Sequence, residues 1–159
     1  MDYKSSGYGR LLGSMPPKRY KVGIIPHIDE LTHPTFPTIA GAIEGSVLIS
    51  PSDEPMRVLE MIASCESILS SAMHGLIIAD GMGIPNKRIL TCGSMYAQNG
   101  KFEDYYSVYE ISPKILDVRG KDLSSYDWAE VAESITRDYA ILYDKVRSIK
   151  QELLECFPF

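Results

Sequence analysis

The chain has 159 residues, with 16 basic and 21 acidic side chains, a net charge of −5 and 45% hydrophobic residues. This length suits one domain that buries its core without help from disulfides or metals. The acidic balance, and the lack of any basic stripe interleaved with aromatic residues, exclude a non-specific nucleic-acid binder.

The cysteines and the N-terminus indicate a cellular compartment. Cys65, Cys92 and Cys156 are far apart, odd in number, and lack the spacing of a zinc site. They are typical of buried or incidental thiols in a reducing compartment. We expect no metal, and no bound cofactor is expected either. The first 21 residues contain no continuous apolar segment of the kind a signal peptide needs, and no run reaches membrane-spanning length. We therefore expect a cytoplasmic protein without a transmembrane segment.

Residues 1–19 are rich in Gly, Ser, Pro and Tyr without a clear period, which predicts a lead-in or linker before a single domain at 20–159. Short β-rich runs then predict strands at 20–25, 46–50, 67–71 and 87–92, with a last strand or edge in 114–120. Apolar stripes between these strands predict helices near 39–44, 55–65, 73–82 and 101–111. Strands that alternate with helices predict a three-layer, Rossmann-like α/β fold with a mostly parallel sheet.

Three helices carry clear end signals. Ser52 or Asp53 can cap the helix that has Pro55 in its first turn. Gly83 is positioned to end the helix at 73–82. Apolar residues at steps of three or four from Trp128 to Leu153, with Asp127 and Glu130 as a capping pair, predict a long C-terminal helix that packs through one face.

The strongest candidate site lies where the strand at 67–71 meets the following helix. Ser70 and Ser71 end the strand, His74 falls in the first helical turn, and Gly75 leaves room for close approach. Helix N-termini at the carboxyl edge of a parallel sheet bind anions, so phosphate or carboxylate is the expected ligand. A helix cap followed by a histidine that bonds a neighbouring carbonyl explains the same spacing, and both interpretations stay open here. The chain has no GxGxxG, GxxxxGK[ST] or GxSxG motif.

Two other groups of polar residues lie at predicted strand ends. His27 follows the strand at 20–25 and should lie at the same sheet edge as His74, where it is either a second donor or a residue that fixes the turn after Pro26. Lys87 and Arg88 begin the fourth strand at the opposite edge, where we expect them to face solvent or a neighbouring chain.

These segments resemble one known family. ILSSAMHGLIIADGMGIPN, from Ile68 to Asn86, closely resembles the serine-pair and His-Gly segment of the polysaccharide pyruvyl transferase family. VGIIPHID, from Val22 to Asp29, is similar to that family's strand ending in Pro-His. KFEDYYSVYEI, from Lys101 to Ile111, is similar to its Lys-Phe-x-Asp-Tyr-Tyr-Ser element. The three matches occur in order between about residues 20 and 119.

The resemblance implies one half of a glycosyltransferase-B-type fold, in which two Rossmann-like halves face a cleft. It implies transfer of a pyruvyl group from phosphoenolpyruvate onto a sugar diol, which forms a pyruvate ketal in a cell-surface polysaccharide. His74, His27 and Asp104 are then the expected catalytic residues. Ser70, Ser71, Gly75 and Lys101 are the expected substrate-binding residues, and no metal is expected. The chain resembles the C-terminal, donor-binding half, so a second chain could supply the other half.

Two alternatives of other classes remain open at this stage. A glycosyltransferase-like domain could hold the diphosphate of a nucleotide sugar at the same helix end, but it needs an acidic side chain for the ribose hydroxyls. Glu110 and Asp117 are only weakly marked for that role. A non-catalytic subunit or truncated remnant would keep the fold without turnover.

Overall fold

The computed structural model describes residues 14–92, 99–110 and 112–156, and its central feature is a five-stranded sheet in the order β2-β1-β3-β4-β5. Every pairing in the sheet is parallel. Its strands are β1 (Tyr20–Ile25), β2 (Ser46–Leu48), β3 (Cys65–Ser70), β4 (Asn86–Leu90) and β5 (Leu116–Asp117).

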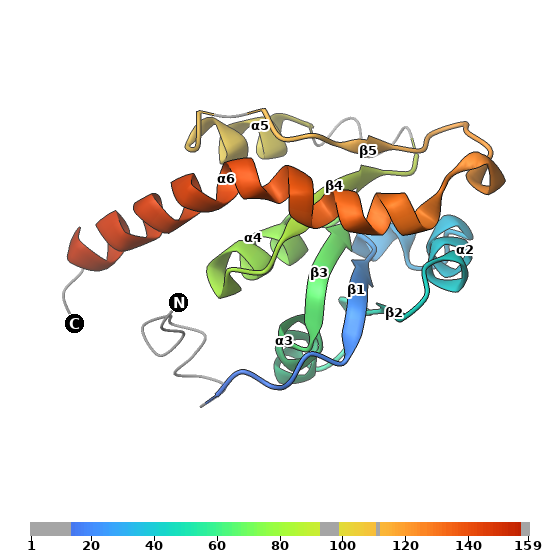
Figure 1. The fold of residues 1–159 in the computed structure, drawn as a ribbon, viewed down its shortest axis with the longest axis horizontal. Coiled ribbons are helices and arrows are strands. Elements are labelled where there is room, and N and C mark those ends of the chain that lie inside the picture. Colours follow the sequence, from blue (N-terminus) through green and yellow to red (C-terminus); the bar gives the residue numbers. More distant parts are fainter. Residues whose placement is uncertain (1–13, 93–98, 111, 157–159) are drawn as a thin grey trace.

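Helices cover both faces of this sheet (Figure 1). The helices are α2 (Thr35–Ala42), α3 (Pro55–Ala63), α4 (Met73–Met82), α5 (Asn99–Ser107) and α6 (Trp128–Cys156), with short 3₁₀ turns η2 (Ile28–Glu30) and η4 (Leu123–Ser125). Side chains from α2 and α6 form one apolar layer with β1, β3 and β4, and α3 and α4 form the other. The predicted three-layer α/β fold with a parallel sheet is therefore confirmed.

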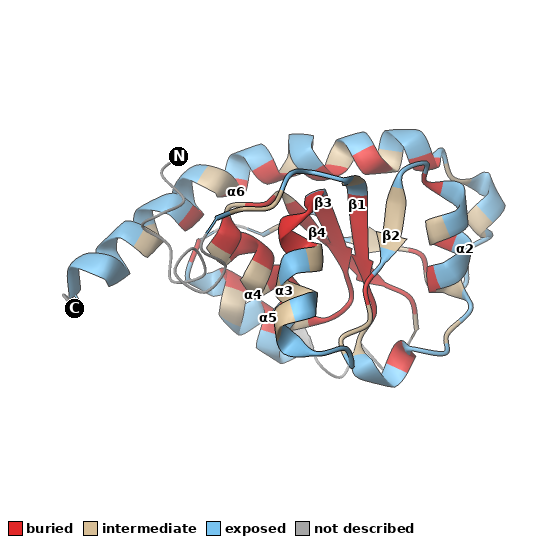
Figure 2. Cartoon of the chain, turned by 90° about the horizontal axis from the view of Figure 1, so that it is seen from below, coloured by how far each residue is buried: buried red, intermediate tan, exposed pale blue. Residues whose placement is uncertain are grey.

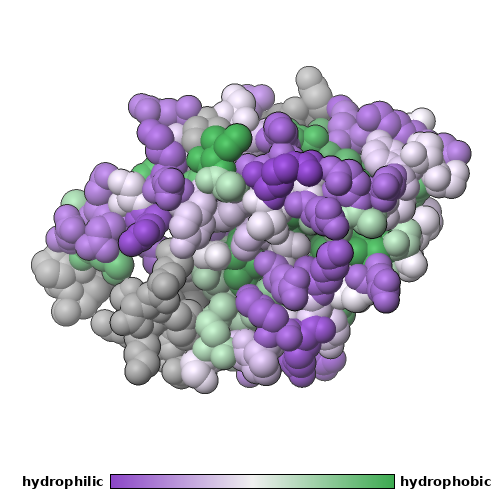
Figure 3. Space-filling model, viewed as in Figure 1, coloured by the Kyte–Doolittle hydropathy of each residue, from purple (hydrophilic) through white to green (hydrophobic). Residues whose placement is uncertain are grey.

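The burial pattern explains why these segments take their places. The central strands are buried in Figure 2, and most helices turn a buried face inward and an exposed face to solvent. In α4 only His74 is exposed. In α6 the buried positions recur at steps of three or four: Trp128, Ala132, Ile135, Tyr139, Leu142 and Val146. The outer side of this helix is hydrophilic in Figure 3. The predicted apolar stripe extended to Leu153, which is in fact 56% exposed because the last turns of α6 lie beyond the body (Figure 1).

Several predicted boundaries match the structure and others shift by a few residues. β1 and α4 have their predicted bounds, and Gly83 ends α4 in the left-handed conformation with φ 69°. Glu54 caps α3 by accepting the N–H groups of Met56 and Arg57, in place of the predicted Ser52 or Asp53. Asp127 accepts the N–H groups of two residues in the first turn of α6, as expected for its cap.

The lead-in predicted at residues 1–19 is described from residue 14 onward, and residues 1–13 lie outside the described residues. Lys18 donates from Nζ to the carbonyl oxygens of Ala63 (2.9 Å) and Cys65 (2.6 Å). These bonds join the end of the lead-in to the turn between α3 and β3.

The expectation that Lys87 and Arg88 face solvent or a neighbouring chain is wrong. Lys87 is buried and forms a 2.6 Å ion pair with Asp138 of α6. The Arg88 guanidinium lies 3.5 Å from the ring centroid of Phe102 in α5. Because β4 has helices on both faces, its charged side chains are covered, and burial is stable only with such partners.

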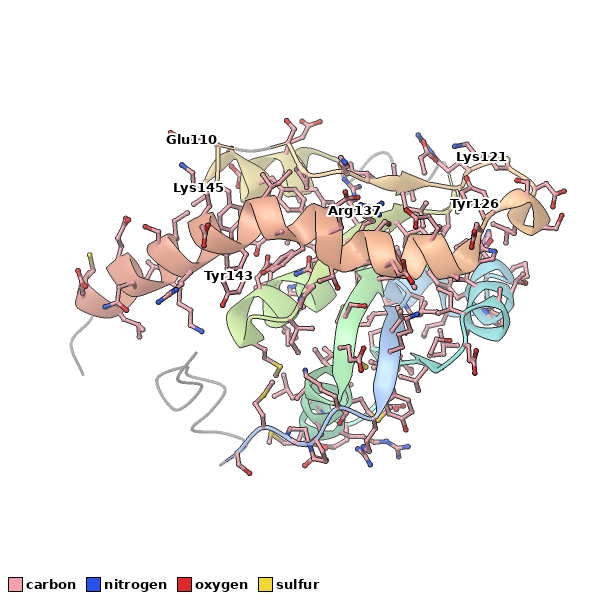
Figure 4. All side chains as sticks on the ribbon, in the orientation of Figure 1. Glu110, Lys121, Tyr126, Arg137, Tyr143 and Lys145 are labelled. Carbon is pink, nitrogen blue, oxygen red and sulfur yellow. The ribbon has the colours of Figure 1, made fainter. Side chains whose placement is uncertain are left out.

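A buried polar network joins α4, α5 and α6. The carboxylate of Asp80, which is 3% exposed, accepts hydrogen bonds from Tyr105 (2.5 Å), Tyr139 (2.8 Å) and Asn86 (2.6 Å). Burial raises the pKa of Asp80, although these three hydrogen bonds act in the opposite direction. An exposed ion pair between Glu110 and Lys145 (3.6 Å) adds a second link from the end of α5 to α6 (Figure 4). These contacts fix α5 beside the sheet.

None of the helices in the described part of the chain combines the length and the apolar character of a membrane-spanning segment.

Candidate functional site

The strand order reverses between β1 and β3, and their carboxyl ends define the candidate site. The second strand lies on one side of β1 and the third on the other, so the connections leave the sheet in opposite directions. In doubly wound sheets, ligands bind in the crevice at such a reversal. We call this region the switch point, defined by His27, Glu30, Ser71 and the first turn of α4.

A hydrogen-bonded chain crosses the switch point. The backbone N–H of His27, after β1, donates to Ser71 Oγ after β3 (2.8 Å). Ser71 Oγ in turn donates to Glu30 Oε2 (2.5 Å). The other carboxylate oxygen of Glu30 accepts from the Thr91 hydroxyl and from Cys92 Sγ (3.2 Å), which follow β4. One carboxylate therefore connects the ends of three strands.

Glu30 is a site residue that the sequence analysis missed. It is only 3% exposed, although it lies in a segment for which the sequence predicted neither a strand nor a helix. The available signal was two acidic residues, Asp29 and Glu30, immediately after a strand and a Pro-His pair. A loop carboxylate is usually solvated, so sequence alone gave no reason to expect its burial.

Ser70 stabilises the start of α4 from within the fold. Its side chain is fully buried. Ser70 Oγ accepts the N–H of Ala72 (3.0 Å) and lies within hydrogen-bonding distance of the carbonyl oxygens of Ile25 (3.0 Å) and Ala72 (2.9 Å). This hydroxyl thus shapes the turn that aims α4 at the switch point.

Gly75 has a packing role at the start of α4. A Cβ at this position would lie 2.7 Å from Ser70 Oγ and 3.1 Å from Ile25 Cδ1. Gly75 therefore allows close contact between α4 and the ends of β1 and β3, and its expected role in ligand approach stays a prediction. The lack of a side chain lets the helix N-terminus sit directly on the sheet edge.

Replacing Gly75 with alanine is expected to destabilise the protein. Overpacking costs about 1–3 kcal/mol, and it is only partly offset by about 1 kcal/mol of improved helix propensity. Gly41→Ala in α2 is the matched control, because a Cβ there meets nothing within 4 Å and should stabilise the helix. Urea denaturation of both variants measures the difference. Equal stabilisation by the two substitutions would contradict the packing argument.

The two predicted catalytic histidines lie at the switch point in different environments. His74 is the second residue of α4 and is exposed, and the N-cap residue Ala72 makes no side-chain capping hydrogen bond. His27 is half-buried, and its Nδ1 accepts the N–H of Asp29 (3.3 Å). In the neutral imidazole this leaves Nε2 as the protonated nitrogen of His27. The histidines are linked through the backbone, because His27 N–H bonds Ser71, three residues before His74.

The structure places Lys101 and Asp104 on the exposed side of α5, one helical turn apart. They are not part of the hydrogen-bonded chain at the switch point formed by the described residues. Asp117, at the end of β5, is instead engaged by Arg119 through hydrogen bonds of 2.9 and 2.6 Å. The side-chain hydrogen bond from Arg119 lowers the pKa of Asp117 to about 2.

Cysteines and acidic residues give no sign of a metal centre. In the ranges that the structure describes, no three His, Cys, Asp or Glu side chains are arranged to hold a metal ion. Cys65, Cys92 and Cys156 carry thiols that are not in disulfides, and burial raises the pKa of Cys65 to about 12. The groups present at the switch point are histidines, hydroxyls, backbone amides and the Glu30 carboxylate.

Fold and site together define a doubly wound α/β domain in which two histidines and a helix N-terminus lie at the switch point. Residues 8–86 match the family model for polysaccharide pyruvyl transferase. This match confirms the resemblance to the polysaccharide pyruvyl transferase family that was seen in VGIIPHID and ILSSAMHGLIIADGMGIPN. The third resembling segment, from Lys101 to Ile111, lies outside the matched residues.

Two curated proteins are similar to the chain. An uncharacterized protein of Acanthamoeba polyphaga mimivirus is 29% identical over 145 residues, which cover 87% of this chain and 49% of that protein. The succinoglycan biosynthesis protein ExoV of Rhizobium meliloti (strain 1021) is 32% identical over 78 residues, covering 49% of this chain and 24% of ExoV. The aligned part of the chain thus spans about half of the first relative and a quarter of the second. No solved structure matches the chain significantly.

Proposed function

We propose that this chain binds phosphoenolpyruvate at the switch point and supplies the donor-binding part of a pyruvyl transferase that acts on a saccharide. One observation carries the proposal. The segment that matches the family, residues 8–86, contains the ends of β1 and β3 and the start of α4, which are the elements that meet at the switch point. The similarity to a succinoglycan biosynthesis protein supports a polysaccharide as the acceptor.

The proposed reaction sets clear chemical demands. Protonation of the methylene carbon of phosphoenolpyruvate makes its C2 cation-like, and one hydroxyl of the acceptor attacks C2 and loses its proton. The second hydroxyl then displaces phosphate at C2 and also loses a proton, which closes the ketal ring. The site must therefore hold an anion, donate one proton and accept protons from two hydroxyls.

The described residues can be matched to these demands. The exposed His74 and the uncapped N-terminus of α4 form the anion clamp, since both present N–H donors at the positive end of a helix. His27 acts as acid in its imidazolium form, which donates from Nε2 while its Nδ1 faces the Asp29 carboxylate at 3.4 Å. Ser70 and Ser71 act from inside the fold, where their hydroxyls hold the two strand ends.

We assign α5 to the more exposed part of the same site. Lys101 contacts the donor and Asp104 serves as the base in this proposal, which the likeness of Lys101–Ile111 to the family element supports. Their exposure leaves both side chains free to reach a ligand. A nucleotide-sugar donor has less support, because Asp117 is engaged by Arg119 and Glu110 pairs with Lys145.

Calorimetric titration and a coupled phosphate-release assay test the proposal together. We expect the chain alone to bind phosphoenolpyruvate, and to release phosphate only slowly with a mixed diol acceptor, since relatives extend well beyond the aligned region. Binding of a nucleotide sugar in place of phosphoenolpyruvate would contradict the donor assignment. Rapid turnover by the isolated chain as a monomer would instead contradict the proposal that it supplies only the donor-binding part.

A further inference from the structure

Glu30 is a buried carboxylate whose role the proposed reaction leaves open. It is 3% exposed, and it accepts hydrogen bonds from Ser71, Thr91 and Cys92. Removing a carboxylate from water costs several kcal/mol unless such donors satisfy it. If this position served only folding stability, an apolar side chain there would avoid the free-energy cost of removing a carboxylate from water. Its position under the switch point therefore calls for a functional reason.

The hydrogen-bond directions show what Glu30 controls. A serine hydroxyl has a single hydrogen. Ser71 Oγ accepts the backbone N–H of His27, and its own hydrogen is donated to Glu30 Oε2. Glu30 therefore sets the orientation of the Ser71 hydroxyl, and this hydroxyl holds the main chain of His27 against the end of β3.

Glu30 also couples the third strand end. Its second oxygen accepts from Thr91 and Cys92, which directly follow β4. The two oxygens thus face donors on two different strands, while the carboxylate itself is carried by η2 after β1. A side chain that reaches both sets of donors is required, so the length of the glutamate matters as well as its polarity.

We propose that Glu30 is a positioning residue, which sets the spacing of His27 and the N-terminus of α4 by holding Ser71 and Thr91 together. The binding test of this role rests on the proposed function, because the spacing affects donor affinity only if the donor binds at the switch point. Among the described residues, no hydrogen bond or ion pair is seen between the Glu30 carboxylate and either histidine side chain. Its effect on the ligand passes through Ser71 and the backbone of His27.

Substitutions at Glu30 separate the effect of side-chain length from the effect of charge. Glutamine keeps the length, and it can accept from Ser71 through its oxygen while its amide donates to the Thr91 hydroxyl. Aspartate keeps the charge but is one methylene shorter, so it cannot serve both donors. We expect E30D and S71A to bind phosphoenolpyruvate about three- to tenfold more weakly than the parent chain. E30Q should have an affinity close to that of the parent. Glu66→Gln, an exposed site near the amino end of β3, is the control that should change nothing.

Calorimetry and amide hydrogen exchange provide the two measurements. The His27 amide should exchange faster in E30D and S71A than in the parent, because its bond to Ser71 is loosened. A loss of affinity in E30Q as large as that in E30D would overturn the proposal, because it would show that donor binding requires the negative charge of Glu30. Parent-like affinity in folded E30D would overturn it in favour of simple fold support.

The exchange measurement also separates this proposal from the proposed function. If the parent chain fails to bind phosphoenolpyruvate, the donor assignment fails, and the exchange rate of the His27 amide alone decides the role of Glu30. Faster exchange in E30D than in E30Q then upholds the positioning role. Equal rates in all variants overturn it.

Discussion

A His74→Gln variant is expected to bind phosphoenolpyruvate about ten- to a hundredfold more weakly than the parent chain. His74 is exposed in the first turn of α4, beside N–H groups that no side chain of the N-cap residue satisfies. A protonated imidazole donates a charge-assisted hydrogen bond to an anion, which is worth about 1.5–3 kcal/mol, whereas a glutamine amide donates only a neutral one. The substituted side chain is similar in size and exposed, so the fold should be kept.

Calorimetric titration of both proteins measures this difference. His33→Gln is a suitable control, because His33 lies before α2 and its Nδ1 accepts the N–H of Thr35 (3.4 Å). That variant should retain the parent's affinity. Equal affinity of the His74→Gln variant and the parent would show that the imidazole does not meet the donor.

An Asp80→Ala variant is expected to lose about 3 kcal/mol or more of folding stability. Three donors would lose their acceptor: the buried hydroxyl of Tyr139, the buried amide of Asn86 and the partly buried hydroxyl of Tyr105. Each unsatisfied buried group costs about 1–3 kcal/mol, and the vacated volume adds to the loss. The hydroxyls cannot avoid this cost by ionising, because burial raises the pKa of both tyrosines. Urea denaturation of the parent and the variant measures the change.

Asp80→Asn is the matched control, and it also tests the pKa of Asp80. Asparagine keeps the shape and one acceptor, so it should lose much less stability than alanine. Because burial raises the pKa of Asp80 in the folded protein, its contribution is complete below the unfolded value of 3.8 and is lost as pH rises through the folded value. The parent should therefore lose stability relative to Asp80→Asn as pH rises from about 4 to neutrality. A constant difference over this range would contradict the raised pKa.

Local signals account for the elements that were predicted with their observed bounds. β1 ends where Pro26 follows it, and α4 ends at Gly83, which adopts a positive φ that other residues disfavour. The cap of α3 shows the limit of such signals. Ser52, Asp53 and Glu54 all precede Pro55, and only the folded loop geometry brings the Glu54 carboxylate onto two N–H groups.

The candidate site was predicted in position but not in full composition. His27, Ser71 and His74 were found because strand ends and helix starts can be located from apolar runs, and parallel strands bring their carboxyl ends to one edge. Gly75 was also selected, but for open approach, whereas its contact with Ser70 and Ile25 appears only when α4 packs on the sheet. Glu30 was missed, since its partners Ser71 and Thr91 are 41 and 61 residues away.

The amino-acid sequence by itself determined the alternation of strands and helices, the parallel three-layer class and the location of the switch-point histidines, because each depends on periodicity or on residues close together in the chain. Only the tertiary structure decided the burial of Lys87, Arg88, Asp80 and Glu30. Each of these charged or acidic groups is stable inside the protein through partners on other elements, such as Asp138 for Lys87 and Phe102 for Arg88. Such pairings arise from the packing of segments that are distant in the chain, so a local sequence pattern does not predict them.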